Sequence, residues 1–252
     1  MSTLAYIILF TLLGSLVSLF GGIVLLAREK LAIKVAPFLA AFAAGALLAT
    51  AFLDLLPEAA EASQGTNIFF WALAGFIFFF LLERSIHWFH HHYGHYEHPE
   101  HESTRPTVTL ILLGDSVHNF IDGVAIAASF MIDIKLGIMT ALAVGAHEIP
   151  QEIGDFGVML KSGISRKKVL WFNVVTALTA LVGAVLTYFI GSGIEGVLPI
   201  FLAITAGFFI YIAASDLIPE IYHKHQKQFA VMLSSVFILG VVAVGSFVAL
   251  FE

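Results

Sequence analysis

Two apolar stretches of the sequence carry clustered imidazole, carboxylate and amide side chains, which are common protein ligands of divalent metal ions. The candidate ligands are His118, Asn119 and Asp122 in the first stretch and His147, Glu148, Gln151 and Glu152 in the second. Residues four apart share one face of a helix, so each stretch would present its ligands together. Cysteine is absent, which removes thiolate chemistry and disfavours a Cu(I) site. The pattern predicts a site for Zn²⁺ or another divalent first-row ion.

Two further carboxylates extend this polar region. Asp115 falls on the face of His118 and Asp122, and Asp155 continues the acidic stripe of the second stretch. A charged side chain at the centre of a bilayer costs about 2.5 to 3.5 kcal/mol, so acids in apolar stretches are functional candidates. A single buried histidine is more often a hydrogen-bonded packing residue. Two histidines with several neighbouring acids favour a bound cation, which would offset much of the cost.

The composition predicts an all-α integral membrane protein. Hydrophobic residues make up 59% and charged residues 12% of the 252 residues, and the mean hydropathy is +0.94. The net charge of −6 gives no indication of a nucleic-acid partner. A helix needs about 20 apolar residues to cross a bilayer. The expected spans are Leu4–Ala27, Val35–Leu56, Ile68–Phe89, Thr107–Phe130, Leu136–Leu160, Val169–Ile190, Val197–Ile218 and Phe229–Phe251. We therefore expect residues 1–252 to form one transmembrane domain of eight helices.

The basic residues predict an orientation. With the N-terminus outside, eleven of the twelve lysines and arginines fall in cytoplasmic links, and Lys135 falls outside. An even number of spans then leaves both termini outside. The sequence has no N-x-Ser/Thr acceptor site and little beyond the membrane unit, which favours a bacterial inner membrane.

An internal repeat aligns residues 37–58 with residues 199–220, with nine identities in twenty-two positions. Both copies end in Asp-Leu-x-Pro-Glu, so Asp54 and Glu58 correspond to Asp216 and Glu220. Shared small-residue composition explains the matched alanines, but it does not easily explain the matched acids. The two copies would cross the membrane in opposite directions, and inverted repeats are typical of secondary transporters. We expect the two acid pairs to concentrate cations, one pair near each surface.

A histidine-rich tract follows the third expected span, and we expect residues 87–105 to form a cytoplasmic loop. Its histidines are His87, His90, His91, His92, His95, His98 and His101. Such tracts bind metals weakly and exchangeably. The tract is predicted to receive or sense delivered metal, although a polar linker without this role is the simpler alternative.

Two other functions would also use a buried metal site. An intramembrane zinc metalloprotease uses a His-Glu-x-x-His motif, but here Gln151 replaces the second histidine and Pro150 lies between. A membrane metal sensor without transport needs only one access route to its site. Acid pairs near both surfaces favour a transporter, which is not an enzyme.

The HNFxDG and HExPxExGD patterns, beginning at His118 and His147, resemble those of the ZIP (Zrt/Irt-like) family of divalent-metal transporters. The resemblance implies eight spans in a 3+2+3 arrangement, a metal centre between spans four and five, and metal movement into the cytoplasm. It implies that zinc is the first candidate substrate, with iron, manganese and cadmium as alternatives.

Position by position, the resemblance makes His118, Asn119, Asp122, His147 and Glu148 ligands and places Glu152 in the branch motif. Gln151 stands where the most similar branch has histidine and other members have glutamate, so we expect weaker ligation there. The coupling ion and the oligomeric state stay open, with a homodimer among the alternatives. Lipid and divalent metal ions are the expected partners.

Overall fold

The computed structural model describes residues 2–63, 65–92, 105–191, 197–219 and 227–251, and every regular element in these ranges is helical. The elements are α1 (Thr3–Ala27), α2 (Glu29–Thr50), η1 (Ala51–Leu55), α3 (Leu56–Ala62), α4 (Ile68–His92), α5 (Arg105–Ile132), α6 (Ile134–Lys161), α7 (Arg166–Gly191), α8 (Leu198–Ile212), η3 (Ala213–Leu217) and α10 (Lys227–Phe251). The segments η1 and η3 are π-helical continuations of α2 and α8. The expected all-helical fold is confirmed, and helices cover each of the eight apolar runs.

Seven stretches of the described chain are long and apolar enough to cross a membrane. They are Thr3–Val24, Lys34–Ala62, Ile68–Ser85, Ile111–Ile132, Arg166–Gly191, Leu198–Leu217 and Phe229–Leu250. The remaining long helix, α6, has 28 residues but carries His147, Glu148 and Glu152 near its middle, which lowers its hydropathy. These three side chains are buried, and α6 packs against α1, α2 and α5. Its polar residues are therefore kept inside the helical bundle.

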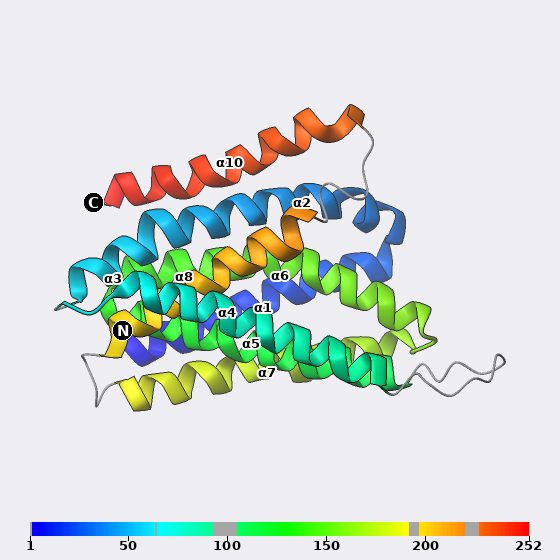
Figure 1. Cartoon of the computed structure of the whole chain (residues 1–252). Coiled ribbons are helices and arrows are strands. Elements are labelled where there is room, and N and C mark those ends of the chain that lie inside the picture. Colours follow the sequence, from blue (N-terminus) through cyan, green and yellow to red (C-terminus); the bar gives the residue numbers. More distant parts are fainter. Residues whose placement is uncertain (1, 64, 93–104, 192–196, 220–226, 252) are drawn as a thin grey trace.

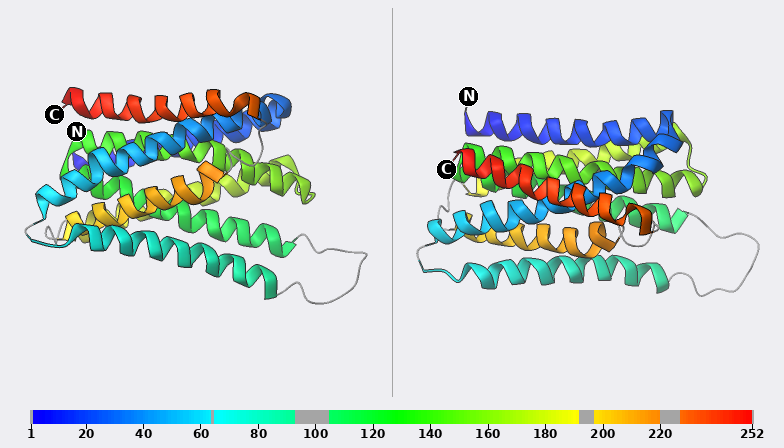
Figure 2. Two further views of the ribbon diagram at one scale, coloured as in Figure 1. Left: turned by 45° about the horizontal axis from the view of Figure 1, so that its top comes forward. Right: turned by 90° about the horizontal axis from the view of Figure 1, so that it is seen from above.

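The helices run along one common direction, and the start of α1 and the end of α10 lie at the same end of the bundle (Figure 1; Figure 2). The short link between α5 and α6 lies at that end too, while the links between α1 and α2 and between α6 and α7 lie at the opposite end. The most extensive helix contacts pair α5 with α7, α1 with α6, α2 with α10 and α4 with α8. Helices α5 and α6 also contact each other, and α1 contacts α7.

Glycines bring two of these helix pairs into backbone contact. Gly45 of α2 lies against the carbonyl oxygen of Phe237 of α10, and Gly207 of α8 lies against the carbonyl oxygen of Ala72 of α4. A Cβ atom at either glycine would collide with that oxygen. Small residues permit such close packing of membrane helices. Gly45 and Gly207 occupy matching positions of the two aligned sequence segments, and each lies at a backbone contact with a neighbouring helix.

The π-helical segments occur at equivalent positions of the same repeat. Residues 51–55 align with residues 213–217, and each segment contains the repeated aspartate, Asp54 in η1 and Asp216 in η3. A π-helical turn changes the direction of the following side chains relative to the helix before it, and such turns are frequent at functional sites. Each of the two aligned segments therefore contains a π-helical turn at the same position.

Candidate metal centre

The link between α5 and α6 sets which residues of the two helices face each other. Asp133 is the residue between them, and its Oδ1 accepts hydrogen bonds from the backbone amides of Lys135 and Leu136 at the start of α6. Side-chain caps of this kind satisfy amide groups that the first turn of a helix leaves unpaired. Because the link is so short, the two helices run antiparallel. His118 and His147 are nearly equally far from the link along the chain, so they lie side by side.

Four side chains of α5 and α6 converge on one point: His118, Asp122, His147 and Glu148. Their ligand atoms all lie within 4.8 Å of one another. The two Nε2 atoms of His118 and His147 are 3.0 Å apart, and Asp122 Oδ2 lies 3.5 Å from the first and 3.3 Å from the second. Glu148 Oε1 lies 3.9 Å from His118 Nε2.

These separations match the edge of a tetrahedral zinc site. Zn²⁺ binds histidine nitrogen and carboxylate oxygen at about 2.0 to 2.2 Å, which places neighbouring ligands of a regular tetrahedron about 3.3 to 3.6 Å apart. Four of the six separations among these atoms lie between 3.0 and 3.9 Å, around that value, and all six are within 4.8 Å. The two imidazoles and two carboxylates can therefore hold one divalent ion after small side-chain adjustments.

His147 is held in the orientation that metal ligation requires. Its Nδ1 lies 3.2 Å from the carbonyl oxygen of Ala143, one turn earlier on α6. A carbonyl oxygen can only accept, so Nδ1 carries the proton and Nε2 is left with its lone pair toward the centre. A backbone carbonyl on the second ring nitrogen is a usual device for orienting a histidine ligand. His147 Nε2 also approaches Asp122 Oδ2 at 3.3 Å.

The centre is closed to solvent. His147 is fully buried, and His118, Asp122 and Glu148 are 8%, 2% and 3% exposed. Within the described ranges, Asp122 Oδ2 and Glu148 Oε1 are buried without a hydrogen-bond partner. Buried polar atoms are normally satisfied, and an unpaired buried charge is costly. Electron-pair donors gathered in this way favour a cation between them.

The predicted ligand Asn119 lines a pocket together with Asp122 and Glu148 of the centre. Its Nδ2 donates to Asp115, to Oδ1 at 2.9 Å and to the backbone oxygen at 3.1 Å. Asp115 is buried and also lies within hydrogen-bonding reach of Thr176 of α7. Asn119 thus connects the metal centre to the Asp115 carboxylate, and Thr176 is a contact that the sequence analysis did not identify.

Three predicted residues of α6 fall outside the four-residue group. Gln151 is half-buried, and Asp155 is half-buried one turn further on. Glu152 is buried, and neither of its carboxylate oxygens has a hydrogen-bond partner in the part of the chain that the structure describes. The charges of Asp115 and Asp155 act on Glu152. These acids continue the polar interior from the centre along α6.

The acid pairs of the repeat lie away from the centre. Asp54 and Glu58 are half-buried near the end of the bundle that holds both chain ends, and the charges of Glu61 and Asp133 act on Glu58. Asp216 is exposed toward the opposite end and accepts a hydrogen bond from Ser215. Glu220 lies outside the described residues. Glu61 and Asp133 are acids near the first pair that the sequence analysis did not include.

The histidine tract begins on a helix. Helix α4 continues to His92 and α5 begins at Arg105, so the first four histidines of the tract, His87, His90, His91 and His92, lie on helical backbone. His95, His98 and His101 lie outside the described residues. The expected cytoplasmic loop 87–105 stays a prediction, because most of its residues lie outside the described ranges.

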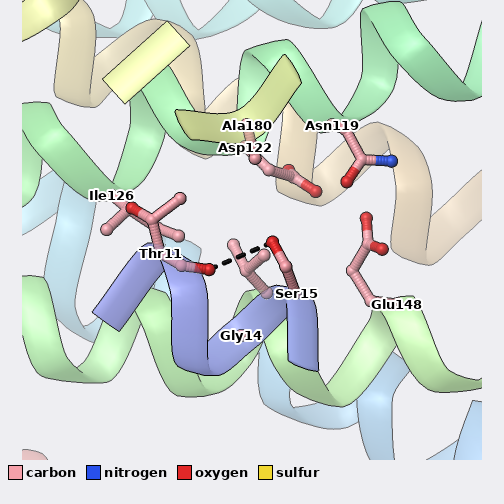
Figure 3. Close-up of a pocket in the computed structure, with 9 residues that line it drawn as sticks. Thr11, Gly14, Ser15, Asn119, Asp122, Ile126, Glu148 and Ala180 are labelled. Carbon is pink, nitrogen blue, oxygen red and sulfur yellow. Dashed lines mark hydrogen bonds between the residues drawn. The ribbon is translucent and has the colours of Figure 1, made fainter. Parts of the chain in front are cut away.

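Helix α1 contributes two residues that the sequence analysis missed. A small pocket beside the centre is lined by Thr11 and Ser15 of α1 together with Asn119, Asp122 and Glu148 (Figure 3). Thr11 and Ser15 are four residues apart in a mostly apolar helix, and this spacing is the signal that could have revealed them. The centre therefore borders a third helix.

Comparison with known proteins agrees with this geometry. The profile of the family described as ZIP Zinc transporter matches residues 1–109 and 94–249. Similar proteins include zinc transporter ZIP10 of Danio rerio, 41% identical over 119 residues, which are 47% of this chain and 14% of that protein. Zinc transporter foi of Drosophila melanogaster is 36% identical over 151 residues, 60% of this chain and 21% of that protein. Zinc transporter ZIP4 of Mus musculus is 43% identical over 119 residues, 47% of this chain and 18% of that protein.

The matched region thus spans about a seventh to a fifth of the length of these relatives. The family profile, in contrast, covers nearly all of this chain, including both helices of the metal centre. With the helical fold and the buried group around His118 and His147, this match shows that the chain belongs to the ZIP zinc transporter family.

Proposed function

We propose that this protein transports divalent metal cations across a membrane into the cytoplasm, with Zn²⁺ as the first candidate substrate. The observation that carries the proposal is the group of His118, Asp122, His147 and Glu148, buried inside a bundle of membrane-length helices. Family membership supports the same conclusion. An ion held in the middle of an apolar bundle can act as cargo if the protein opens the site to each side in turn.

The chemistry of the ligands favours zinc and its neighbours in the first transition row. Two imidazoles and two carboxylates suit Zn²⁺, Fe²⁺ and Mn²⁺, whereas Ca²⁺ and Mg²⁺ prefer oxygen ligands alone. Cd²⁺ also accepts this set. The similar proteins carry the name zinc transporter, which places zinc first among these candidates.

We further propose eight spans in a 3+2+3 arrangement, with α1, α2 and α4 related by an inverted repeat to α7, α8 and α10. The equivalent π-helical segments and the equivalent contacts of Gly45 and Gly207 support the repeat. The packing of α5 against α7 and of α6 against α1 supports α5 and α6 as the central pair. In this arrangement α6 is the fifth span and brings the number of spans to eight, and residues 1–252 form one transport domain.

The proposed orientation leaves both termini outside. Both chain ends lie at one end of the bundle (Figure 1), which supports an even number of spans. Exposed basic residues gather near the other end, at the start of α2, the end of α4 and the start of α7. That end would face the cytoplasm. A bacterial inner membrane and a homodimer both stay predictions from the sequence.

The proposed route follows the acids. Asp54 and Glu58 would attract cations at the outer end, and Asp216 with Glu220 would do so at the inner end. Between them lie the centre and the acids Asp115, Glu152 and Asp155. The histidine tract, at the inner end in this orientation, would bind delivered metal after release.

Flux measured on the purified protein tests the proposal. The full chain is reconstituted in vesicles that enclose a zinc-sensitive dye, and Zn²⁺, Mn²⁺, Fe²⁺ and Cd²⁺ are offered outside. We expect saturable uptake of Zn²⁺ and competition by the other ions. Metal binding without flux would identify a sensor instead. Cleavage of a membrane-embedded peptide without flux would identify the protease alternative.

A further inference from the structure

The two histidines of the metal centre are held in place by different means. His147 is oriented by the carbonyl oxygen of Ala143, which lies 3.2 Å from its Nδ1. The polar contacts of His118 within the described part of the chain all involve its Nε2. A histidine ligand normally has a partner on its second ring nitrogen, and that partner fixes the orientation of the ring. A contact of another kind therefore has to orient His118.

The ring of Phe79, on α4, lies against the ring of His118. The two ring centres are 5.6 Å apart and the ring planes meet at 86°, which is an edge-to-face arrangement. Aromatic rings prefer this arrangement, because the edge of one ring carries partial positive charge and the face of the other carries partial negative charge. Phe79 is 6% exposed, so the contact lies inside the bundle. Such a contact restricts rotation of the imidazole about its side-chain bonds.

Phe79 is itself fixed by two aromatic residues of α8. Its ring centre lies 5.4 Å from that of Phe208 and 5.4 Å from that of Tyr211. The Tyr211 hydroxyl donates a hydrogen bond to the carboxylate of Glu83, which lies one turn after Phe79 on α4. Enclosed between α4 and α8 in this way, the Phe79 ring has little freedom to change its rotamer.

The same helix pair also contacts the other histidine. The ring centre of Phe209, on α8, lies 6.2 Å from that of His147, and the planes meet at 63°. His147 has the Ala143 carbonyl as well, so this aromatic contact is a second support. For His118, the ring of Phe79 takes the place of the carbonyl.

We propose that Phe79 is a positioning residue, which holds the His118 imidazole with Nε2 turned toward His147 and Asp122. The inference rests on the proposed function, since it requires a divalent cation at the centre. Phe79 touches the ligand and does not bind the ion. An aliphatic side chain in its place would let the imidazole rotate. Affinity for the ion would then fall, because binding would have to stop that rotation.

The test measures binding of Zn²⁺ and Co²⁺ to the purified full chain. The visible absorption of Co²⁺ is intense in tetrahedral sites and weak in octahedral ones. We expect Phe79→Leu to lower Zn²⁺ affinity about 10-fold and to weaken the tetrahedral Co²⁺ bands. Phe76→Leu is the matched control and should change neither. Phe76 is half-buried on the same helix and contacts the same Tyr211 ring, at 5.2 Å between ring centres, but within the described ranges it makes no ring contact with His118.

Two further variants locate the effect at His118. In a His118→Ala background, Phe79→Leu should cause no further loss of the residual Zn²⁺ affinity, because the ligand that Phe79 positions is already gone. Phe209→Leu should lower affinity less than Phe79→Leu, since the Ala143 carbonyl still orients His147. Thermal unfolding in detergent shows whether each variant is folded, and Phe79→Ile is used if Phe79→Leu is not.

The outcomes separate the two proposals. Wild-type affinity and an unchanged Co²⁺ spectrum in Phe79→Leu would overturn the positioning role and leave the metal centre standing. An equal loss in Phe76→Leu or in Phe209→Leu would also overturn it, since the effect would not be specific to the ring beside His118. The same further loss in the His118→Ala background would overturn it by placing the effect elsewhere. Equal affinity of the wild-type protein and His118→Ala would overturn the proposed function and this inference together.

Discussion

The Nε2 atoms of His118 and His147 lie 3.0 Å apart, although the two residues are 29 positions apart in the chain and belong to different helices. The other ring nitrogen of His147, Nδ1, lies 3.2 Å from the carbonyl oxygen of Ala143, and this contact orients Nε2 toward the His118 ring. The carboxylate oxygen Asp122 Oδ2 lies within 3.5 Å of both nitrogens. This concentration of electron-rich atoms is the strongest physical argument for a bound cation.

We expect His118→Ala and His147→Ala each to reduce saturable Zn²⁺ uptake to background while the protein still inserts into membranes. Each change removes one of the two imidazoles from the centre. Uptake into vesicles and the amount of protein in the membrane fraction are measured together. Met139→Leu is the control, because Met139 is a buried residue of α6 outside the centre and leucine has a similar volume. Near-normal uptake by either histidine variant would remove that histidine from the mechanism.

Restoring a ligand at Gln151 should tighten Zn²⁺ binding. Gln151 lies one turn after His147 and is half-buried, and its neutral amide is a poor zinc ligand compared with imidazole. We expect Gln151→His to raise Zn²⁺ affinity by about 10- to 100-fold and to slow turnover where release limits the rate. Calorimetric titration and uptake kinetics on the same variant measure both effects. Unchanged affinity for every metal tested would mean that position 151 does not face the ion.

Replacing the seven histidines of the tract from His87 to His101 by serine should lower the transport rate without eliminating transport. The ligands of the centre lie on α5 and α6, so the tract is not needed to hold the ion in the bundle. Initial rates of Zn²⁺ uptake are compared at equal expression. Complete loss of flux with normal expression would show instead that the tract is an obligatory part of the route.

Single cysteines should report the orientation, because the native chain contains none. Lys135 and Lys168 are both exposed, and they lie at the starts of α6 and α7, at opposite ends of the bundle (Figure 1). We expect Lys135→Cys to react with a membrane-impermeant thiol reagent in intact cells and Lys168→Cys to react only after the membrane is opened. The reverse pattern would invert the proposed orientation and the direction of transport inferred from it.

Gly45→Leu and Gly207→Leu should destabilise the protein by similar amounts, about 3 kcal/mol or more. Each leucine would force apart a helix pair now in backbone contact, α2 from α10 or α8 from α4. Thermal unfolding in detergent measures the effect. Gly154→Leu is the control, since Gly154 is exposed and has open space at its Cβ. A large loss in one variant alone would argue against equivalent packing in the two halves.

The sequence by itself determined the helices and the candidate ligands. In lipid a single chain segment satisfies its backbone groups only as a helix, so runs of apolar residues of sufficient length predict the helices and their approximate bounds. The spacing of His118 and Asp122 places both on one face, because the helix repeats every 3.6 residues. These are local properties of a helix, and a sequence records them directly.

The tertiary structure decided which of the candidates meet. Among the acids of α6, Glu148 rather than Glu152 joins the two histidines, because the packing of α6 against α1, α2 and α5 fixes its rotation about its own axis. Thr11 and Ser15 line the pocket beside the centre because α1 packs on α6, a contact between residues more than 130 positions apart. Helical periodicity predicts which side chains share one face of a helix. Which neighbouring helix covers that face depends on how the surfaces of all the helices fit together, so it is a property of the whole bundle.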